Sequence, residues 1–404
     1  MKVLFITSLL KGGGAEVFLY ELVRGLSKSG DVNIVIVSGS STGASDYNFA
    51  NVKTHVISNT KLYFQEWLLG LSDPLIEKRL KKLLQSEKPD IVHLNNFLGL
   101  GPAVIRALRD VAFPIVVTIH DYWPICPKTT LVYTGRGVME SPCQNTRRCL
   151  KGMCVRFLKI LPHLNCLLIQ RFNSFREEVL DFLKSSTVIA VSNYVKHILE
   201  QHGLNNVRVI YNGRTFEKVD LSYESWKNRN CILYLGGSRP EKGYHIMKHL
   251  LHDICGNYEY RKLFSSFTFV IRSDKRDINC MDLKLEISSF FHDIRRYFSG
   301  SFITLIPSIC QETLSYTAIE AVAYGSLVLA FKVGGIPEVI PESLFLVEPI
   351  DAMSFYERLV DIVRSDRKYL YEKLKVIREH VIKTFNIERM VRNYYDLYIK
   401  LISR

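Results

Sequence analysis

Apolar and polar positions along the first half of the chain alternate between two periods. Continuous apolar runs, typical of buried strands, occupy 3–7, 32–37, 91–94, 115–119 and 187–191. Between the first two runs, apolar residues recur at helical spacing before Gly30: Phe18, Leu19, Leu22, Val23 and Leu26. Fully apolar strands that alternate with helices indicate a parallel sheet covered by helices on both faces. The pattern therefore predicts a doubly wound α/β domain.

A polar stretch interrupts this alternation, and a second cycle follows it. The stretch starts at Asn212-Gly213 and extends to Asn230, and the later strands are expected at 232–235, 267–271, 302–306 and 327–331. A chain of 404 residues is long enough for two domains with a core each. We expect two Rossmann-like domains, 1–212 and 213–385. Their ligands should bind beyond the carboxyl ends of the strands, in a cleft between the domains.

The end of the chain, 386–404, has the pattern of an amphipathic helix. Asn386 is a suitable N-cap for it. The apolar positions that follow have helical spacing; they are Ile387, Met390, Val391, Tyr394, Tyr398 and Leu401. This helix is a candidate to pack back on the first domain.

Two glutamates follow the predicted strand that stops at Pro307-Ser308. Glu312 is expected at the N-terminus of a helix and Glu320 two turns further along it, and Gly325 is expected to end the helix. A helix N-terminus with free N–H groups suits a phosphate, and two carboxylates suit the hydroxyls of a polyol. An ordinary amphipathic helix with two solvated glutamates would have the same pattern.

Composition places the chain among folded soluble proteins, with 47 % apolar and 23 % charged residues. The first residues, 1–7, lead straight into a glycine-rich turn and lack the cleavage site of a signal peptide. No window reaches the ~18 to 20 uninterrupted apolar residues that a membrane-spanning helix needs. We expect a cytoplasmic protein, with contact to the cytoplasmic face of a membrane as an open alternative.

Part of the formal net charge of +13 is concentrated in a basic, cysteine-containing insertion at about 122–176. Its cations, with no Asp or Glu among them, are Arg147, Arg148, Lys151, Arg156, Lys159, Arg171 and Arg176. Such a block suits anionic lipid headgroups, a diphosphate-linked acceptor or nucleic acid. The segment 155–169 fits a broken helix on a bilayer surface, and equally a helix packed on the core with its basic face in water. Nucleic acid is disfavoured because no recognised binding module accompanies the charge.

Eight short motifs, in order along nearly the full length, carry a family resemblance. They are Gly12-Gly-Gly-Ala-Glu16, Thr118-Ile-His-Asp121, Ser192-Asn193, Val209-Ile-Tyr-Asn-Gly213, Gly236-Gly-Ser-Arg-Pro-Glu-Lys-Gly243, Pro307-Ser308, the segment from Glu312 to Glu320, and Gly334-Gly-Ile-Pro-Glu338. With this set, the chain resembles the retaining glycosyltransferases of family 4. The resemblance implies a GT-B fold, a nucleotide-activated sugar as donor, no obligatory metal cofactor, and retention of anomeric configuration.

In the second domain, the resemblance implies that Lys242 neutralises a donor phosphate as the leaving nucleotide gains charge. Glu312 would contact the hydroxyls of the donor sugar near the reacting carbon, and Glu320 would accept from the ribose hydroxyls. Backbone amides of Glu312, Thr313 and Leu314 would meet the diphosphate or sugar at a helix N-terminus. A solvated surface lysine is the alternative for Lys242.

The chain departs from the family pattern at one donor position. Where the family usually places an Arg, five residues before the Lys, this sequence has Gly237. Arg239 is close enough in the sequence to substitute, in a shifted register. The segment Val270-Ile-Arg-Ser273 also lacks the expected glycines, which leaves the nucleotide base open.

In the first domain, Gly12, Gly13 and Gly14 form a turn that would let the backbone approach the donor phosphates or sugar, or that is simply a tight turn. His120 ends a predicted strand and resembles the active-site histidine of the family, which would bond a donor hydroxyl and help place the acceptor. Asp121 is a weaker candidate for orienting the acceptor. The expected mechanism is front-face displacement, with double displacement as the alternative.

The insertion also holds a group of four cysteines, Cys126, Cys143, Cys149 and Cys154. Structural zinc, disulfides and free thiols are all compatible with their spacing. The remaining cysteines are expected to be small buried residues; they are Cys166, Cys231, Cys255, Cys280 and Cys310.

The sequence thus predicts a two-domain glycosyltransferase that moves a hexose from a nucleoside-diphosphate sugar to a glycan or a lipid-linked saccharide. Two other functions remain open on the same residues. One is another GT-B reaction, such as that of a nucleotide-sugar epimerase. The other is a non-catalytic protein that binds a sugar nucleotide or nucleic acid.

Overall fold

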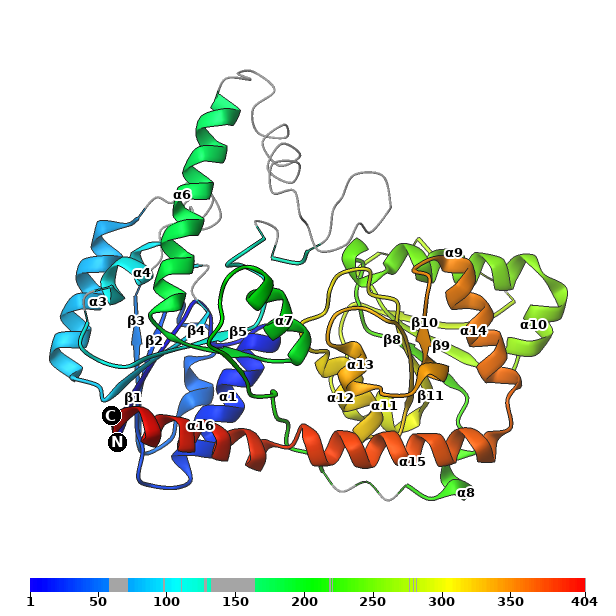
Figure 1. Cartoon of the computed structure of the whole chain (residues 1–404). Helices are drawn as coiled ribbons and strands as arrows, with labels where there is room; N and C mark the ends of the chain where they lie inside the picture. Colours follow the sequence, from blue (N-terminus) through cyan, green and yellow to red (C-terminus); the bar gives the residue numbers. More distant parts are fainter. Residues whose placement is uncertain are drawn as a thin grey trace. The chain divides into compact units, whose positions relative to one another are not determined.

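A computed structural model describes residues 1–57, 72–96, 99–109, 111–126, 129–131, 164–217, 219, 221–275, 277–278, 280 and 282–403; of these, the side chains of 164–169 and 172 are not described. The chain divides into two compact units (Figure 1). The first unit combines Met1–Thr215 with Asn386–Arg404, and the second is Phe216–Phe385. The first boundary follows Thr215, where the sequence predicted it after residue 212.

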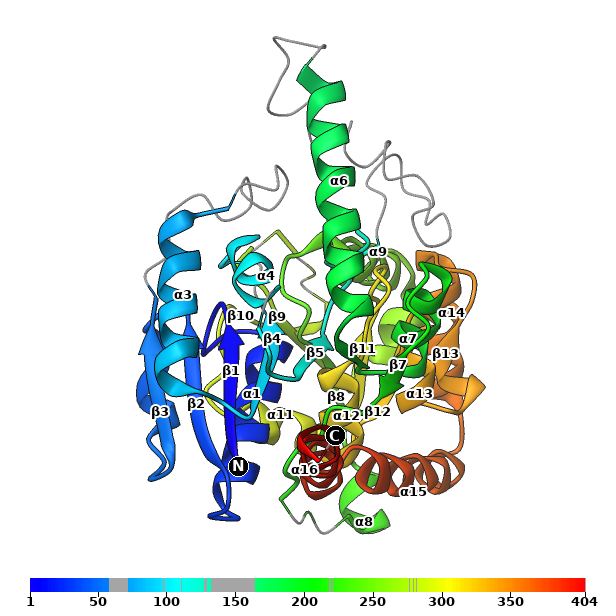
Figure 2. The same cartoon turned by 60° about the vertical axis from the view of Figure 1, so that its left-hand side comes forward.

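The first unit is built on a seven-stranded sheet of order β3-β2-β1-β4-β5-β6-β7, in which all neighbours pair in parallel. Its strands are β1 (Lys2–Thr7), β2 (Asn33–Ser38), β3 (Val52–Val56), β4 (Ile91–Asn96), β5 (Ile115–Ile119), β6 (Thr187–Ala190) and β7 (Val207–Val209). Its helices before the C-terminal segment are α1 (Gly14–Ser27), η1 (Ala44–Tyr47), α3 (Pro74–Glu87), α4 (Ala103–Leu108), α6 (Leu164–Lys184) and α7 (Asn193–Gln201). In two views α6 extends away from the sheet (Figures 1 and 2).

The second unit repeats this design with a six-stranded parallel sheet of order β10-β9-β8-β11-β12-β13. Its strands are β8 (Cys231–Tyr234), β9 (Thr268–Arg272), β10 (Lys284–Ser288), β11 (Ser301–Ile306), β12 (Leu327–Phe331) and β13 (Leu346–Val347). Its helices are α8 (Tyr223–Trp226), η2 (Pro240–Lys242), α9 (Tyr244–Gly256), α10 (Tyr258–Phe264), α11 (Ile294–Gly300), α12 (Tyr316–Ala323), α13 (Ile336–Val339), η3 (Ser343–Phe345), α14 (Ala352–Arg364) and α15 (Arg367–Thr384). The two parallel sheets confirm the predicted fold class of two doubly wound α/β units.

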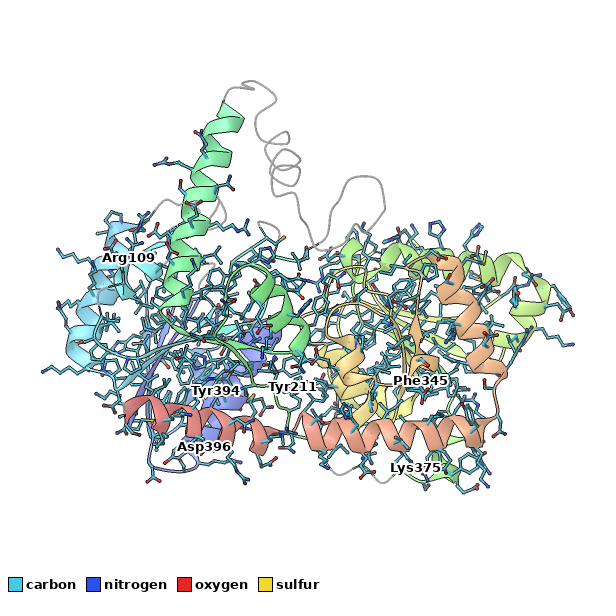
Figure 3. All side chains as sticks on the ribbon, in the orientation of Figure 1. Arg109, Tyr211, Phe345, Lys375, Tyr394 and Asp396 are labelled. Carbon is cyan, nitrogen blue, oxygen red and sulfur yellow. A yellow bond between two sulfur atoms is a disulfide. The ribbon has the colours of Figure 1, made fainter. Side chains whose placement is uncertain are left out.

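The last helix, α16 (Ile387–Ile402), belongs to the first unit and completes its core. Asn386 caps it by accepting a hydrogen bond of 2.7 Å from the Arg389 amide. Tyr394 is fully buried, whereas Asp396 lies on the exposed face of the helix (Figure 3). Helix α16 therefore packs its apolar stripe against the same core as β1 and α1.

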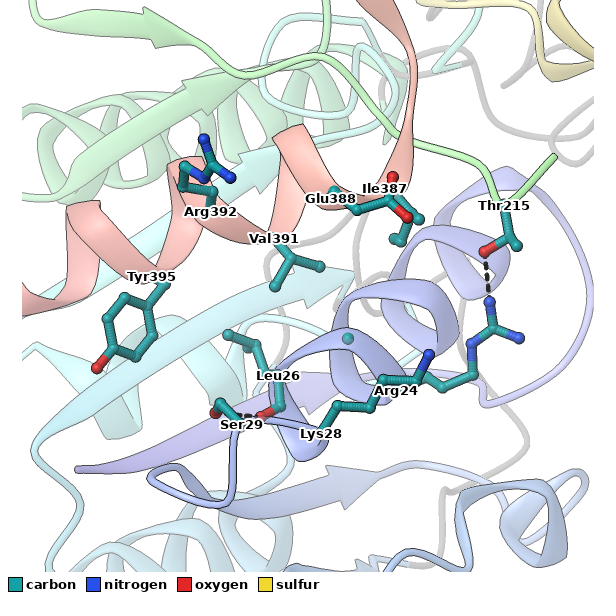
Figure 4. Close-up of a pocket in the computed structure, with 11 residues that line it drawn as sticks. Arg24, Leu26, Lys28, Ser29, Thr215, Ile387, Glu388, Val391, Arg392 and Tyr395 are labelled. Carbon is teal, nitrogen blue, oxygen red and sulfur yellow. Dashed lines mark hydrogen bonds between the residues drawn. The ribbon is translucent and has the colours of Figure 1, made fainter. Parts of the chain in front are cut away.

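Close contact between α1 and α16 requires a glycine in α1. A Cβ atom on Gly25 would lie 2.2 Å from Cγ2 of Val391. The two helices flank a surface pocket whose facing walls include Leu26 and Val391 (Figure 4). At the end of this pocket, Arg24 donates a hydrogen bond to Thr215, near the point where the chain leaves the first unit.

Two cysteines of the second unit form a disulfide, which corrects the expectation that they are unconnected buried residues. Cys255 lies in α9 and Cys280 in the loop between β9 and β10, and their Cα atoms are 6.2 Å apart. The bond joins positions separated by 25 residues, with α10 and β9 between them. Cys231 and Cys310 are free thiols; Cys310 is buried as expected, whereas Cys231 is only partly buried.

We predict that Gly25→Ala destabilises the first unit by roughly 1–3 kcal/mol, because the added methyl group overlaps Val391. Helix propensity alone would change the free energy of unfolding by about 1 kcal/mol in the opposite direction. Urea unfolding of the full chain measures the difference.

Two further variants make this test specific. Gly25→Ala with Val391→Ala should recover stability, since the second change removes the methyl group that is overlapped. Gly256→Ala is the matched control, because no atom lies within 4 Å of its Cβ position. A Gly25→Ala protein at least as stable as the wild type would show that the helices do not pack this closely.

Candidate active site

Three loops of the second unit meet at one edge of its sheet. They follow β8, β11 and β12, which are neighbours in the strand order. Because the strands are parallel, their carboxyl ends lie on the same edge of the sheet. The loop after β8 carries Lys242, the loop after β11 carries Glu312, and the loop after β12 carries Gly334. The fold thus brings together residues that are far apart in the sequence.

Lys242 and Glu312 form a half-buried ion pair. Nζ of Lys242 donates to Oε1 of Glu312 at 2.6 Å, and the Ser308 hydroxyl donates to the same oxygen at 2.6 Å. Only 24 % of the lysine side chain and 12 % of the glutamate side chain are exposed. Lys242 is therefore not a solvated surface lysine.

The ion pair holds both groups in their charged forms. Burial alone would raise the pKa of Glu312, but the Lys242 ammonium and the Ser308 hydroxyl outweigh it and lower that pKa. Burial likewise opposes the charge of Lys242, and Glu312 outweighs it, so that the pKa of Lys242 is raised. Within the described part of the chain, Oε2 of Glu312 receives no hydrogen bond, and Nζ of Lys242 has no second acceptor. Both groups thus retain bonding capacity for a ligand.

Backbone contacts hold the three loops together. The Gly335 amide donates to the Glu312 carbonyl at 2.7 Å. A Cβ atom on Gly334, whose φ is +56°, would lie 2.0 Å from that carbonyl oxygen. A Cβ atom on Gly243, whose φ is +78°, would lie 1.8 Å from the Pro307 carbonyl oxygen. Glycine is therefore required at both positions for the loops to meet.

The helix after β11 starts later than the sequence predicted. Helix α12 begins at Tyr316, with Ser315 as the N-cap that accepts from the Ala318 amide at 3.3 Å. Glu312 and the amides of Thr313 and Leu314 consequently precede the helix, and the expectation that they form its N-terminus is wrong. Ser315 is the better N-cap, because its hydroxyl accepts a hydrogen bond from the amide three residues later. Glu320 does lie inside the helix and is partly exposed.

Arg239 lies beside the ion pair without joining it. Its side chain is 63 % exposed, and its Nε is 3.8 Å from Oε1 of Glu241. Its positive charge contributes to the lowered pKa of Glu312, which places it in the same electrostatic environment. Gly237 occupies the position where the family resemblance implies an Arg, and it has a φ of +68°. That left-handed conformation disfavours an arginine there.

In the first unit, His120 immediately follows β5 and contacts β4. Its Nε2 lies 2.9 Å from Oδ1 of Asn95, and its ring lies 4.6 Å from the ring of Phe18. Burial lowers the pKa of His120 to about 3. The imidazole is therefore neutral at physiological pH.

Asp121 is the next residue, and burial favours its neutral form as well. Its Oδ1 accepts a hydrogen bond of 2.8 Å from the Trp123 amide. Burial is the main cause that raises the pKa of Asp121 to about 7, and the charge of Glu16 adds to it. Its proton is therefore held more tightly than that of an ordinary aspartate.

The glycine turn lies between β1 and α1, as the sequence predicted, but one of its amides is already bonded. Gly12 precedes the helix, Gly13 is its N-cap and Gly14 its first residue. The Gly13 amide donates to Oε2 of Glu16 at 2.7 Å, and Glu16 is 6 % exposed. A phosphate at this amide would have to displace a nearly buried carboxylate of the same charge.

Sequence reasoning missed a group of buried polar residues beneath His120. His93 Nε2 lies 2.8 Å from the Thr118 hydroxyl, and His93 Nδ1 lies 2.5 Å from the hydroxyl of Tyr398. The Thr118 hydroxyl also lies 2.9 Å from that of Tyr394. The available signal was the two polar residues His93 and Asn95 at alternate positions of β4, between the apolar residues Ile91, Val92 and Leu94 and the final Asn96.

The predicted cysteine group and basic block fall largely outside the described residues. Cys126 is buried, but Cys143, Cys149 and Cys154 lie outside the described ranges, so the group stays a prediction. Of the basic block, only Arg171 and Arg176 are described with their side chains. No group of three or more His, Cys, Asp or Glu in the described ranges could hold a metal ion. Over the same ranges, no helix has both the length and the apolar character to cross a membrane.

Two protein-family models match the chain. The model described as Glycosyltransferase Family 4 matches residues 12–218, and the model described as Glycosyl transferases group 1 matches residues 229–365. The first match alone extends over more than half of the chain. Together the two matches include every candidate residue described above.

The chain is also similar to individual proteins. An uncharacterized 42.6 kDa protein of the cps region of Klebsiella pneumoniae is 23 % identical over an alignment of 417 positions, gaps included, that covers 96 % of each chain. The UDP-Gal:alpha-D-GlcNAc-diphosphoundecaprenol alpha-1,3-galactosyltransferase of Escherichia coli is 25 % identical over 340 residues, 80 % of this chain and 78 % of that enzyme. The crystal structure of Anabaena HepE in complex with UDP has a TM-score of 0.66 at 15 % identity, over 99 % of this chain and 100 % of HepE. The structural likeness confirms the predicted GT-B fold.

We predict that acid destabilises the first unit through its buried neutral histidines. Burial is the main cause that lowers the pKa of His93 to about 3, so the unfolded chain binds a proton below about pH 6.5 while the folded chain does not. Stability is therefore lost as the pH falls from about 6.5 towards 3. Between pH 7 and pH 5, His93 should contribute a loss of about 2 kcal/mol.

Urea unfolding at these two pH values measures this loss. His93→Gln should show a smaller difference between them than the wild type does. The exposed His197, changed to Gln, is the control and should leave the difference unaltered. If His93→Gln and the wild type lose equal stability, then folding does not lower the pKa of His93.

Proposed function

Since the chain belongs to glycosyltransferase family 4, we propose that it is a retaining hexosyltransferase. It moves a hexose from a nucleoside-diphosphate sugar to a hydroxyl of a glycan or lipid-linked saccharide. The observation that carries this proposal is the ion pair of Lys242 and Glu312 at the carboxyl edge of the second sheet. A cation with unused donors beside a carboxylate with a free oxygen suits a phosphate joined to a polyol.

The second unit, predicted as 213–385, binds the donor in this proposal. Lys242 neutralises a diphosphate oxygen, which gains negative charge as the glycosidic bond breaks. Oε2 of Glu312 accepts from a hydroxyl of the donor sugar, and Glu320 accepts from the ribose hydroxyls. Arg239, exposed and close to the pair, adds positive charge for the diphosphate. Thr313 and Leu314 contribute backbone amides from the loop that precedes α12.

The first unit, predicted as 1–212, binds the acceptor. His120 contacts a sugar hydroxyl, and Asp121 orients the acceptor. Gly12, Gly13 and Gly14 provide room for close approach rather than a phosphate cradle, since the Gly13 amide already bonds Glu16. No metal ion is required, because the cations of the second unit meet the charge of the leaving group.

The reaction is a front-face displacement. The bond between the anomeric carbon and the phosphate oxygen breaks, and the acceptor oxygen bonds to that carbon on the same face. The departing phosphate oxygen takes the proton of the acceptor hydroxyl, so that no separate base is needed. Configuration at the anomeric carbon is retained.

The relatives support a particular pair of substrates. The galactosyltransferase of Escherichia coli is named for a UDP-Gal donor and a diphosphoundecaprenol-linked acceptor, and HepE of Anabaena was crystallised with UDP. We therefore propose a UDP-hexose donor and a lipid diphosphate-linked saccharide acceptor, in polysaccharide biosynthesis. The site of action would be the cytoplasmic face of a membrane, which the basic insertion at 122–176 would contact.

The test is a panel of nucleoside-diphosphate sugars offered with a polyprenyl diphosphate-linked GlcNAc, followed by product analysis. We expect UDP to be released only when the acceptor is present, and the product to keep the donor's anomeric configuration. Donor isomerisation without acceptor would indicate an epimerase instead. Tight donor binding without turnover would indicate a binding protein.

We predict that Glu312→Gln and Lys242→Met each lower kcat roughly 10²- to 10³-fold, because each removes a charge matched to the transition state. Each single variant also leaves a half-buried charge unpaired and should lose stability. The double variant should regain stability but not activity. Recovery of activity in the double variant would mean that the pair acts only in folding.

The matched control is another ion pair of the second unit. Lys375 and Glu372 are 2.7 Å apart on α15, and about half of each side chain is exposed (Figure 3 labels Lys375). Lys375→Met and Glu372→Gln should leave kcat and stability close to those of the wild type.

A further inference from the structure

Asn95 is a buried amide that links the glycine turn to His120. It lies in β4 and is 2 % exposed. Its Nδ2 donates to the Ala15 carbonyl at 3.2 Å and to the Thr7 hydroxyl oxygen at 3.4 Å. Its Oδ1 lies 2.9 Å from Nε2 of His120. One side chain thus contacts the end of β1, the start of α1 and the residue after β5.

Two of these partners determine which way the amide faces. The Ala15 carbonyl can only accept, so it must face the NH2 group of Asn95. The Thr7 hydroxyl donates its hydrogen to the Leu9 carbonyl at 2.9 Å, and it can therefore only accept from Asn95. A flipped amide would place Oδ1 against two acceptors. The chemistry of both partners leaves Oδ1, an acceptor, facing His120.

An acceptor facing Nε2 determines where the imidazole proton lies. We propose that Asn95 is a positioning residue that holds His120 as the tautomer protonated at Nε2, with its lone pair on Nδ1. The proposal rests on the proposed function, in which His120 contacts a sugar hydroxyl. It adds that His120 accepts the hydrogen of that hydroxyl through Nδ1 and does not donate to its oxygen.

The surroundings keep the ring neutral, which this role requires. Burial holds the pKa of His120 far below the physiological range. The ring of Phe18 packs against it, and the nearby His93 is itself neutral through burial. A neutral acceptor also suits glycosyl transfer, because positive charge develops on the sugar ring as the donor bond breaks. An imidazolium at this place would repel that charge.

The tautomer can be measured directly in the unliganded full-length chain. Long-range 1H–15N correlation spectra of protein labelled at its 11 histidines distinguish protonated from unprotonated ring nitrogens. The signal of His120 is assigned by its loss in His120→Gln. We expect a single Nε2–H tautomer near neutral pH, and a single Nδ1–H tautomer would overturn the proposal.

Two Asn95 variants test whether Asn95 determines the tautomer of His120. Asn95→Val removes the acceptor, and His120 should then populate both tautomers. Asn95→Asp places a carboxylate beside Nε2 and should shift the ring towards the doubly protonated form. A His120 spectrum that is the same in both variants as in the wild type would overturn the role of Asn95. Thr118→Val, which alters the neighbouring network of His93 but not Asn95, is the control and should leave the His120 tautomer unchanged.

Activity provides a separate readout. With the donor and acceptor of the proposed reaction, both Asn95 variants should lower kcat/KM about tenfold or more, the equivalent of one lost hydrogen bond to a substrate. A wild-type chain that has the expected tautomer but transfers no sugar would refute the proposed function and leave the role of Asn95 intact. Full activity in both variants, with an altered tautomer, would show that the tautomer does not matter for transfer.

Discussion

Parallel pairing of every strand with its neighbours is the constraint from which the positions of the candidate residues follow. Parallel strands place all their carboxyl ends at one edge of a sheet, so the loops that leave this edge meet whatever their distance in the sequence. Lys242, Glu312 and Gly334 meet in this way after β8, β11 and β12. The parallel arrangement places the loops, and glycines at the closest contacts let their backbones touch.

The candidate residues of the two units differ in their charge. The second unit holds an ion pair whose partners stay charged despite being half-buried, which is what a phosphate ligand requires. The first unit holds His93 and His120 neutral by burial, and satisfies them with an amide and hydroxyls. In the proposed reaction, this contrast would let the second unit meet the charge of the nucleotide and the first unit meet uncharged sugar hydroxyls.

Helix α16 connects the end of the chain to the interior of the first unit. Its Tyr394 and Tyr398 reach hydroxyl and imidazole groups on β5 and β4, directly beneath His120 and Asn95. These contacts satisfy polar atoms that would otherwise be buried without partners, at a cost of about 1–3 kcal/mol each. The helix therefore supports the candidate site from below as well as completing the core.

Local patterns in the sequence were enough to determine the alternation of strands and helices, the division into two α/β units and the family. They also identified Lys242 and Glu312 as candidates, because the family motifs are short and contiguous. Although His93 and Asn95 stand out as polar residues in their strand, their partners were not predictable, since these lie as much as 305 residues away. The disulfide of Cys255 and Cys280 and the start of α12 at Tyr316 likewise depended on the folded chain. The reason is physical: periodicity reports which face of an element is buried, whereas hydrogen-bond partners and ion pairs are chosen by which elements the fold brings together.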